Sequence, residues 1–184
     1  GCDMGAYESR GFSLTKVSGD LQSALINTAF AKPLVVDVSS ASGDPVDGGV
    51  VTFTAPASGA STNPPINEST ISAGKASPSL TANGEGGFYN VTANTTGATP
   101  QIEFTLLNSL NGYFFAAPAA EGSADCSSWE ATCTLQTALT FSFNGSEIWV
   151  EAGLHTPGIT RTDTFALKSG VVVYGGFAGT ETSR

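Results

Sequence analysis

The chain from residue 12 to residue 107 alternates between apolar and polar positions in short runs, and clusters of Gly, Pro, Asn and Asp separate these runs. Successive side chains of a β-strand point to opposite faces, so each run can supply one inward-facing apolar row. Short, β-branched runs with regular turn signals are typical of an antiparallel β-sandwich. The expected strands are residues 12–17, 33–38, 50–54, 87–93 and 101–107.

The inward rows predict the core. The expected core positions are Leu34, Val36, Val38, Val51, Phe53, Tyr89, Val91, Ala93, Ile102, Phe104 and Leu106. Residues 25–33 are expected to cross between the two sheets. Residues 55–68 are expected to form a loop with at most an edge strand, because Pro64 and Pro65 are incompatible with a central strand.

The pattern changes near residue 109, where we place a domain boundary. Leu135, Ala138 and Leu139 are spaced as on one face of a helix, with Thr134 as the expected N-cap. Short strands are expected at residues 113–115, 147–150, 164–167 and 171–174. The last three lack two-residue hairpin turns between them, which favours stacked parallel rungs over hairpins.

Composition and charge exclude several classes of function. Charged residues make up 12% of the 184 residues, about half the usual share of roughly 25%. The formal net charge is −9, from seven Lys and Arg against sixteen Asp and Glu. This balance argues against partners rich in phosphate, such as nucleic acids and anionic membranes. No apolar run approaches the roughly 20 residues that span a bilayer.

Three cysteines are present. Cys126 and Cys133 enclose one short loop, and the isolated His155 offers no zinc-site spacing, so we expect a disulfide and an oxidising, extracytoplasmic compartment. Cys2 is then left over, either as a buried thiol or with its partner elsewhere. The chain opens at Gly1 without an initiator Met or a signal peptide. We therefore expect a processed product or an excised piece of a longer protein.

Several stretches resemble known families of bacterial surface proteins. The opening run, residues 2–8, resembles the closing strand of right-handed parallel β-helix domains of the pectin-lyase-like type. Residues 126–133, 135–139, 147–153 and 175–182 resemble the opening of such a domain, where a short helix caps the first rungs. Residues 14–107 resemble bacterial Ig-like modules, and residues 45–53 match their usual turn and strand. The opening run consists of Cys2, Asp3, Met4, Gly5, Ala6, Tyr7 and Glu8.

The resemblance implies an all-β chain with three regions. Residues 1–10 would be a β-helix-type terminal strand, residues 11–109 an Ig-like antiparallel β-sandwich, and residues 110–184 a capped partial parallel β-helix. A solenoid needs about three or more repeats to bury its own face. Such a chain joins two tandem β-helices, or it is a subunit whose ends complete each other across neighbouring copies.

Candidate catalytic chemistry is sparse. His155 lacks a nucleophile motif, so we interpret it as a turn residue. Asp44 and Asp47 are weak candidates for Ca²⁺ and more typical of turns. The acids Glu147, Glu151 and Asp163, with Arg161 and Lys168 nearby, invite comparison with β-helix polysaccharide lyases and hydrolases, but fold analogy alone does not assign activity. We therefore predict no catalytic residue, metal or cofactor.

Four Asn-x-Ser/Thr sequons, at Asn67, Asn90, Asn94 and Asn144, are candidate glycosylation sites. Trp129 and Trp149 are candidates for stacking on sugars, although Trp149 suits packing at the cap equally well.

The sequence predicts a non-enzymatic structural protein of the bacterial cell exterior, such as a fibre, adhesin or surface-layer component. We expect it to self-associate through strand addition by residues 2–8 and rung stacking at its ends. Its partners would be copies of itself, tandem neighbouring domains or surface glycans. The alternatives are a carbohydrate-binding or carbohydrate-cleaving β-helix and a passive Ig-like spacer.

Overall fold

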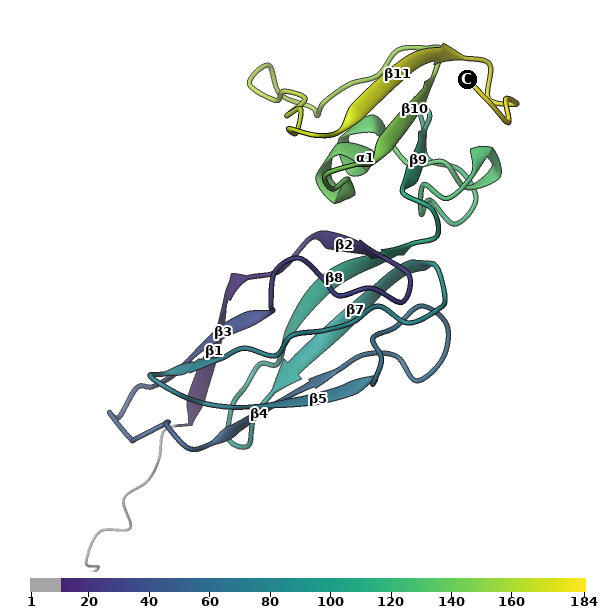
Figure 1. Cartoon of the computed structure of the whole chain (residues 1–184). Helices are drawn as coiled ribbons and strands as arrows, with labels where there is room; N and C mark the ends of the chain where they lie inside the picture. Colours follow the sequence, from purple (N-terminus) through teal and green to yellow (C-terminus); the bar gives the residue numbers. More distant parts are fainter. Residues whose placement is uncertain (1–10) are drawn as a thin grey trace, which may run out of the picture.

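The computed structural model describes residues 11–184. Residues 1–10, which include the expected assembly strand 2–8 and Cys2, lie outside the described residues. The described chain is all-β, with a single α-helix and one short 3₁₀ turn. It forms a first part, residues 11–109, and a second part, residues 110–184, placed end to end (Figure 1).

Two sheets build the first part. The smaller sheet has the order β1-β3-β6, and the larger has the order β2-β8-β7-β4-β5. Most neighbouring strands are antiparallel, but β2 runs parallel to β8 at the edge of the larger sheet. The strands are β1 (Phe12–Ser18), β2 (Gln22–Leu25), β3 (Val35–Ser40), β4 (Val50–Thr54), β5 (Ile66–Thr70), β6 (Lys75–Ala76), β7 (Gly87–Asn94) and β8 (Ile102–Ser109).

The sequence-predicted rows form one hydrophobic core shared by both sheets. Ten of the eleven expected positions are buried in it, and Ile102 is partly buried and packs against it. The rings of Phe53 and Phe104, on β4 and β8, have centroids 6.4 Å apart at its centre. The alternation therefore predicts the core correctly, because burial of one face is what enforces a period of two.

Two strands of the first part, β2 and β6, are not predicted by the alternation. β6 has two residues and pairs with β3. β5 is an edge strand that pairs only with β4, and it overlaps the end of residues 55–68, where the sequence allows an edge strand. β2 precedes the expected crossover and finds its partner in β8, more than 80 residues later in the chain. Such nonlocal pairing has no local signature in the sequence.

The second part is a three-stranded parallel sheet with a helix on one face. Its strand order is β11-β10-β9, and α1 packs against β9 and β10. The elements are β9 (Tyr113–Ala116), the 3₁₀ turn (Trp129–Ala131), α1 (Leu135–Phe141), β10 (Glu147–Glu151) and β11 (Val172–Phe177). Both strand pairs are parallel, as expected for stacked rungs rather than hairpins.

The prediction of a strand at residues 164–167 is wrong, because these residues form no strand. This stretch lies in the long connection between β10 and β11, which pair directly with each other and leave no place between them. The ring of Phe165 packs against the second core, whereas Leu167 is exposed.

A small set of contacts joins the two parts. Leu107 of β8 belongs to the hydrophobic core of the second part. The rings of Phe88 and Phe141 meet edge to face with centroids 4.7 Å apart, and the buried Ser23 hydroxyl donates to the carbonyl of Phe141. The end of α1 is thereby fixed against β2 and β7.

Candidate functional site

A loop covers one edge of the parallel sheet. The amide of Phe115 on β9 donates to the carbonyl of Cys126 (2.9 Å), and its own carbonyl accepts from the amide of Cys133 (3.0 Å). The amide of Ala117 donates to the carbonyl of Cys133 in the same way (2.9 Å). The outer backbone groups of β9 are therefore satisfied, and this edge is closed to further strands.

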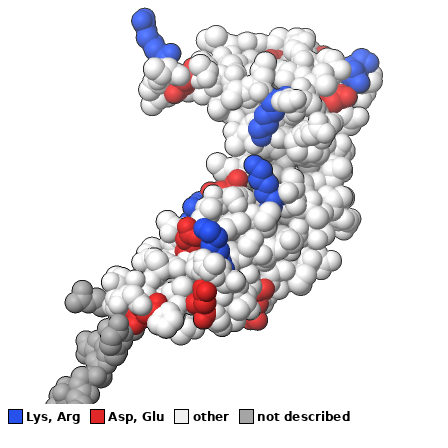
Figure 2. Space-filling model, turned by 60° about the vertical axis from the view of Figure 1, so that its left-hand side comes forward, with Lys and Arg blue, Asp and Glu red and all other residues white. Residues whose placement is uncertain are grey.

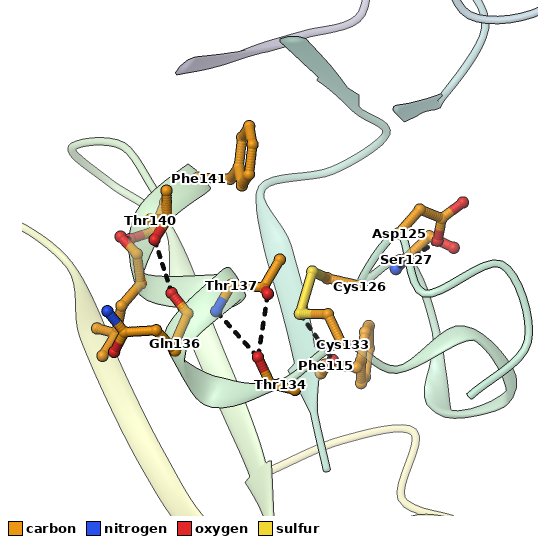
Figure 3. Close-up of a disulfide and its surroundings, with 12 residues drawn as sticks. Phe115, Asp125, Cys126, Ser127, Cys133, Thr134, Gln136, Thr137, Thr140 and Phe141 are labelled. Atoms are coloured by element: carbon orange, nitrogen blue, oxygen red, sulfur yellow. Dashed lines mark hydrogen bonds between the residues drawn. A yellow bond between two sulfur atoms is a disulfide. The ribbon is translucent and has the colours of Figure 1, made fainter. Parts of the chain in front are cut away.

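A disulfide between Cys126 and Cys133 closes this loop (Figure 3). The two Cα atoms are 4.8 Å apart, and both residues are buried beside β9. The Cys133 sulfur also lies 3.7 Å from the carbonyl oxygen of Phe115. The cross-link thus holds the loop against the sheet edge that it covers.

The helix α1 covers one face of the sheet and follows the disulfide loop directly. Thr134 caps it as expected, with its hydroxyl oxygen accepting from the amide of Thr137 (3.2 Å). Ala138, Leu139 and Phe141 are buried in the second core. The helix therefore shields the rows of β9 and β10 that face it.

The opposite edge of the sheet is open. Phe114, Ile148 and Val173 occupy equivalent register positions on the three strands. Phe114 is 1% exposed and Ile148 is 0% exposed, but Val173 is 39% exposed. Within residues 11–184, β11 pairs with β10 alone. The row is therefore buried on β9 and β10 but exposed on β11, because no further strand among residues 11–184 lies beside β11.

The backbone of β11 presents hydrogen-bonding groups at this edge. The amide of Val172 donates to the carbonyl of Ser146, toward β10 (3.0 Å). Alternate residues of a strand direct their backbone groups to opposite edges, so Val173 and Gly175 direct theirs away from β10. An unpaired strand edge of this kind is a template for a further strand.

The connection that leads from β10 into β11 carries exposed apolar side chains. Leu154, Ile159 and Leu167 are the three most exposed large apolar residues of the described chain, and all lie in the connection from β10 to β11. Val172 is exposed on β11 itself.

The face of the sheet opposite α1 is aromatic. Trp149 is buried among Phe115, Tyr113 and Phe177, so it packs within the protein instead of presenting a ring for sugar stacking. Trp129 is half-buried, and its indole N–H donates to the carbonyl of Glu181 (2.8 Å).

The four sequons lie at different places. Asn67 is half-buried on β5, and its amide donates to the carbonyl of Pro64. Asn90 and Asn94 are exposed on β7, and Asn144 is exposed in the turn before β10. Accessibility alone leaves glycosylation a prediction.

The other candidate residues are engaged in local bonds. The carboxylate of Asp44 accepts from the Ser40 hydroxyl, and that of Asp47 accepts from the amides of Ala73 and Gly74. The two side chains thus serve different turns. No group of three or more His, Cys, Asp or Glu within residues 11–184 is arranged to hold a metal ion.

Two of the candidate acids of the second part are engaged by groups of that same part. Glu147 forms an ion pair with Arg184 (3.0 Å), and Asp163 accepts from the amide of Thr160 (2.8 Å), which lowers the pKa of its carboxyl. One ring nitrogen of His155 lies 2.8 Å from the carbonyl oxygen of Glu151, the last residue of β10.

Comparison with known proteins places the chain in no family. No protein-family model and no curated protein sequence matches it. A crystal structure of a conjugative transposon lipoprotein from Bacteroides eggerthii aligns with 53% of this chain and 98% of its own length. The identity is 13% and the TM-score 0.31, values that carry no argument about fold or function. In the described residues, no helix has the length and apolarity needed to cross a membrane.

Proposed function

We propose that this chain is a structural component of an extracellular bacterial surface assembly, such as a fibre, adhesin or surface layer. Copies associate when a strand from one copy adds to the open edge of β11 in the next. The observation that carries the proposal is the register row Phe114–Ile148–Val173, which is buried on two strands and exposed on the third.

Three further features support strand addition at β11. The outward backbone groups of Val173 and Gly175 supply hydrogen-bond partners. The exposed side chain of Val172 supplies apolar surface on the same strand, and the connection leading into β11 carries the exposed residues Leu154, Ile159 and Leu167. The other edge of the sheet is closed by the disulfide loop, so addition occurs at one edge only. Main-chain pairing with side-chain pockets is a common mode of protein assembly.

The strand that we propose as the occupant is residues 2–8 of a second copy. Cys2, Met4 and Ala6 alternate with Asp3, Gly5 and Tyr7, so one face of that strand would be small and apolar. Its inward row then extends the row that ends at Val173. A heterologous contact that does not close generates a filament.

The test is a proline at the open edge. Proline is tolerated in an edge strand where its missing N–H would face solvent, so Val173→Pro removes one outward donor while the pairing with β10 remains. We expect the wild-type chain to form concentration-dependent oligomers in sedimentation velocity and negative-stain images. Val173→Pro should lose them, and the matched control Val173→Thr, which keeps the amide and the β-branch, should retain them.

Deletion of residues 1–9 tests the occupant. It should abolish association to the same extent, and a synthetic peptide of residues 1–9 should compete with assembly of the full chain. A wild-type chain that stays monomeric up to millimolar concentration would refute the proposal. So would oligomers that persist in both Val173→Pro and the deletion variant.

A further inference from the structure

A groove runs along the joint between the two parts of the chain. One wall is formed by residues 17–23 and 31–32 of the first part, and the other by residues 140–143 and Lys168 of the second part. Its volume is about 420 Å³, within the range of roughly 300–1,000 Å³ that is typical of small-molecule sites. Clefts between domains are a preferred location for such sites.

Two lysines face this groove from opposite walls. Lys32 comes from the first part and Lys168 from the second, and Figure 2 shows blue side chains on both sides of the notch between the two parts. Desolvation lowers the pKa of the Lys168 ammonium, and repulsion from Lys32 lowers it further. Both side chains thus line one groove.

Among residues 11–184, no carboxylate forms an ion pair with either groove lysine. The ion pairs of the described residues are Lys16–Asp20, Lys75–Asp37 and Arg184–Glu147. Asp20 is an acid in the groove wall, but its carboxylate accepts from Lys16 and from the amides of Leu21 and Thr105. In a chain of net charge −9, the groove concentrates positive charge.

The ammonium of Lys168 is held in a fixed position. It donates to the carbonyls of Thr140 (2.6 Å) and Ser142 (2.9 Å) at the C-terminal end of α1. An ammonium has three N–H donors, so one remains for a ligand. Preorganised donors of this kind favour binding because less flexibility is lost.

The groove also offers apolar surface. Leu21 is exposed and the ring of Phe143 is half-buried, and both line the groove together with the two lysines. A ligand that fits must therefore carry an anionic group beside a face of C–H groups. A sugar ring with a carboxylate or sulfate substituent has both features.

From this geometry we infer that the groove binds an acidic sugar unit of a surface polysaccharide, with its carboxylate or sulfate held between Lys32 and Lys168. Charge-assisted hydrogen bonds to the two ammonium groups provide specificity for the anion, and packing on Leu21 and Phe143 provides the remaining contact. The site lies apart from the β11 edge and does not depend on assembly.

Calorimetric titration of the full chain with oligogalacturonate and with a sulfated oligosaccharide tests this inference and distinguishes the two anions. We expect saturable binding of at least one, weakened by added salt, and no binding of a neutral oligosaccharide of equal length. Lys32→Gln should weaken the affinity by about tenfold, as loss of one charge-assisted bond predicts. Lys75→Gln removes the same charge from β6, where Lys75 pairs with Asp37, and should leave the affinity unchanged.

Lys32→Gln is the main variant because the side chain of Lys168 also bonds the end of α1. Lys168→Gln is informative when its circular dichroism and melting temperature match the wild type, and it should then weaken binding similarly. Absence of binding to both acidic oligosaccharides, equal binding of the neutral one, or equal effects of Lys32→Gln and Lys75→Gln would overturn the inference. Lysine-dependent binding of an acidic peptide in place of the saccharides would overturn the assignment to a sugar.

Discussion

The indole of Trp149 on β10 stacks on the ring of Phe177 on β11, with centroids 5.0 Å apart and planes 4° apart. Phe177 also contacts Trp129, within the disulfide loop (5.7 Å between centroids). These aromatic contacts lie on the face opposite α1, so they hold β11 in place although no strand among residues 11–184 pairs with its outer edge. The open edge is therefore a structured surface of the protein.

Removing the ring of Phe177 should loosen β11. We expect Phe177→Ala to lower the free energy of unfolding by about 2 kcal/mol, less than for a fully buried ring because Phe177 is half-buried. Tryptophan emission should shift to longer wavelength as Trp149 becomes more exposed. Phe177→Tyr keeps the ring and should change neither measurement appreciably, so equal effects of the two substitutions would contradict the stacking argument.

Opening the disulfide should destabilise the covered edge of the sheet. Cys126 and Cys133 are seven residues apart, and a loop of that size corresponds to about 2 kcal/mol of stabilisation in the chain-entropy model. Urea unfolding followed by circular dichroism should show this loss on addition of reductant. The double variant Cys126→Ser, Cys133→Ser should unfold at the same urea concentration with and without reductant. A wild-type midpoint that reductant does not move would disprove the prediction.

Asn108 is the polar centre of the first part. It is buried, its amide nitrogen lies 2.8 Å from the carbonyl oxygen of Ser61, and its amide oxygen accepts from the Tyr89 hydroxyl (3.0 Å). Asn108→Ala leaves the Tyr89 hydroxyl and the Ser61 carbonyl without these hydrogen-bond partners. We therefore expect a loss of about 3 kcal/mol in the free energy of unfolding. Asn90→Ala, at an exposed position of the same sheet, should change it by less than about 0.5 kcal/mol. Comparable losses in chemical denaturation would refute the assignment.

Acidification should release the contacts around Glu181. The amides of Ala178 (2.7 Å) and Thr180 (3.0 Å) donate to its carboxylate, which lowers the pKa of that carboxyl below its usual 4.5. A carboxyl whose pKa is lower in the folded state stabilises that state above pH 4.5, and this contribution disappears as the pH falls through the folded-state value.

The indole N–H of Trp129, bonded to the carbonyl of Glu181, reports this change by NMR. We expect its resonance to shift below pH 4.5 in the wild type and to stay in place over the same range in Glu181→Gln. The indole N–H of Trp149 donates to a different carboxylate, that of Glu147. Its resonance, recorded in the same spectra, is the internal comparison for the Trp129 shift in the wild type and in Glu181→Gln. A Trp129 transition that survives in Glu181→Gln would assign the titration to another acid.

Local patterns in the sequence predict the core of the first part well. Val36, Phe53 and Phe104 are fully buried where the alternation expects them, because a strand with one buried face cannot shift by one residue without exposing its whole row. The cap and start of α1 are predicted for a similar reason, since Thr134 acts on a residue only three positions away. Both signals are local in the chain.

Nonlocal pairing explains most of what the sequence does not show. The run at residues 164–167 is short and mostly apolar, as a strand would be, but it lies in the connection between two strands that pair directly. The partners of β2 and the strand order of the parallel sheet depend on contacts between distant residues. The exposure of Val173 follows from that order, so the open edge becomes visible only in three dimensions. The groove between Lys32 and Lys168 likewise arises from segments more than a hundred residues apart.

The two edges of the parallel sheet differ in kind, because a cross-linked loop covers one and no strand in the described part of the chain pairs with the other. An array built by strand addition at β11 would therefore be polar, with chemically distinct tips. Lengthening would proceed in a single direction, and a copy lacking a functional β11 edge would terminate growth once incorporated. Small amounts of Val173→Pro mixed with wild type would then shorten the array without dissolving it.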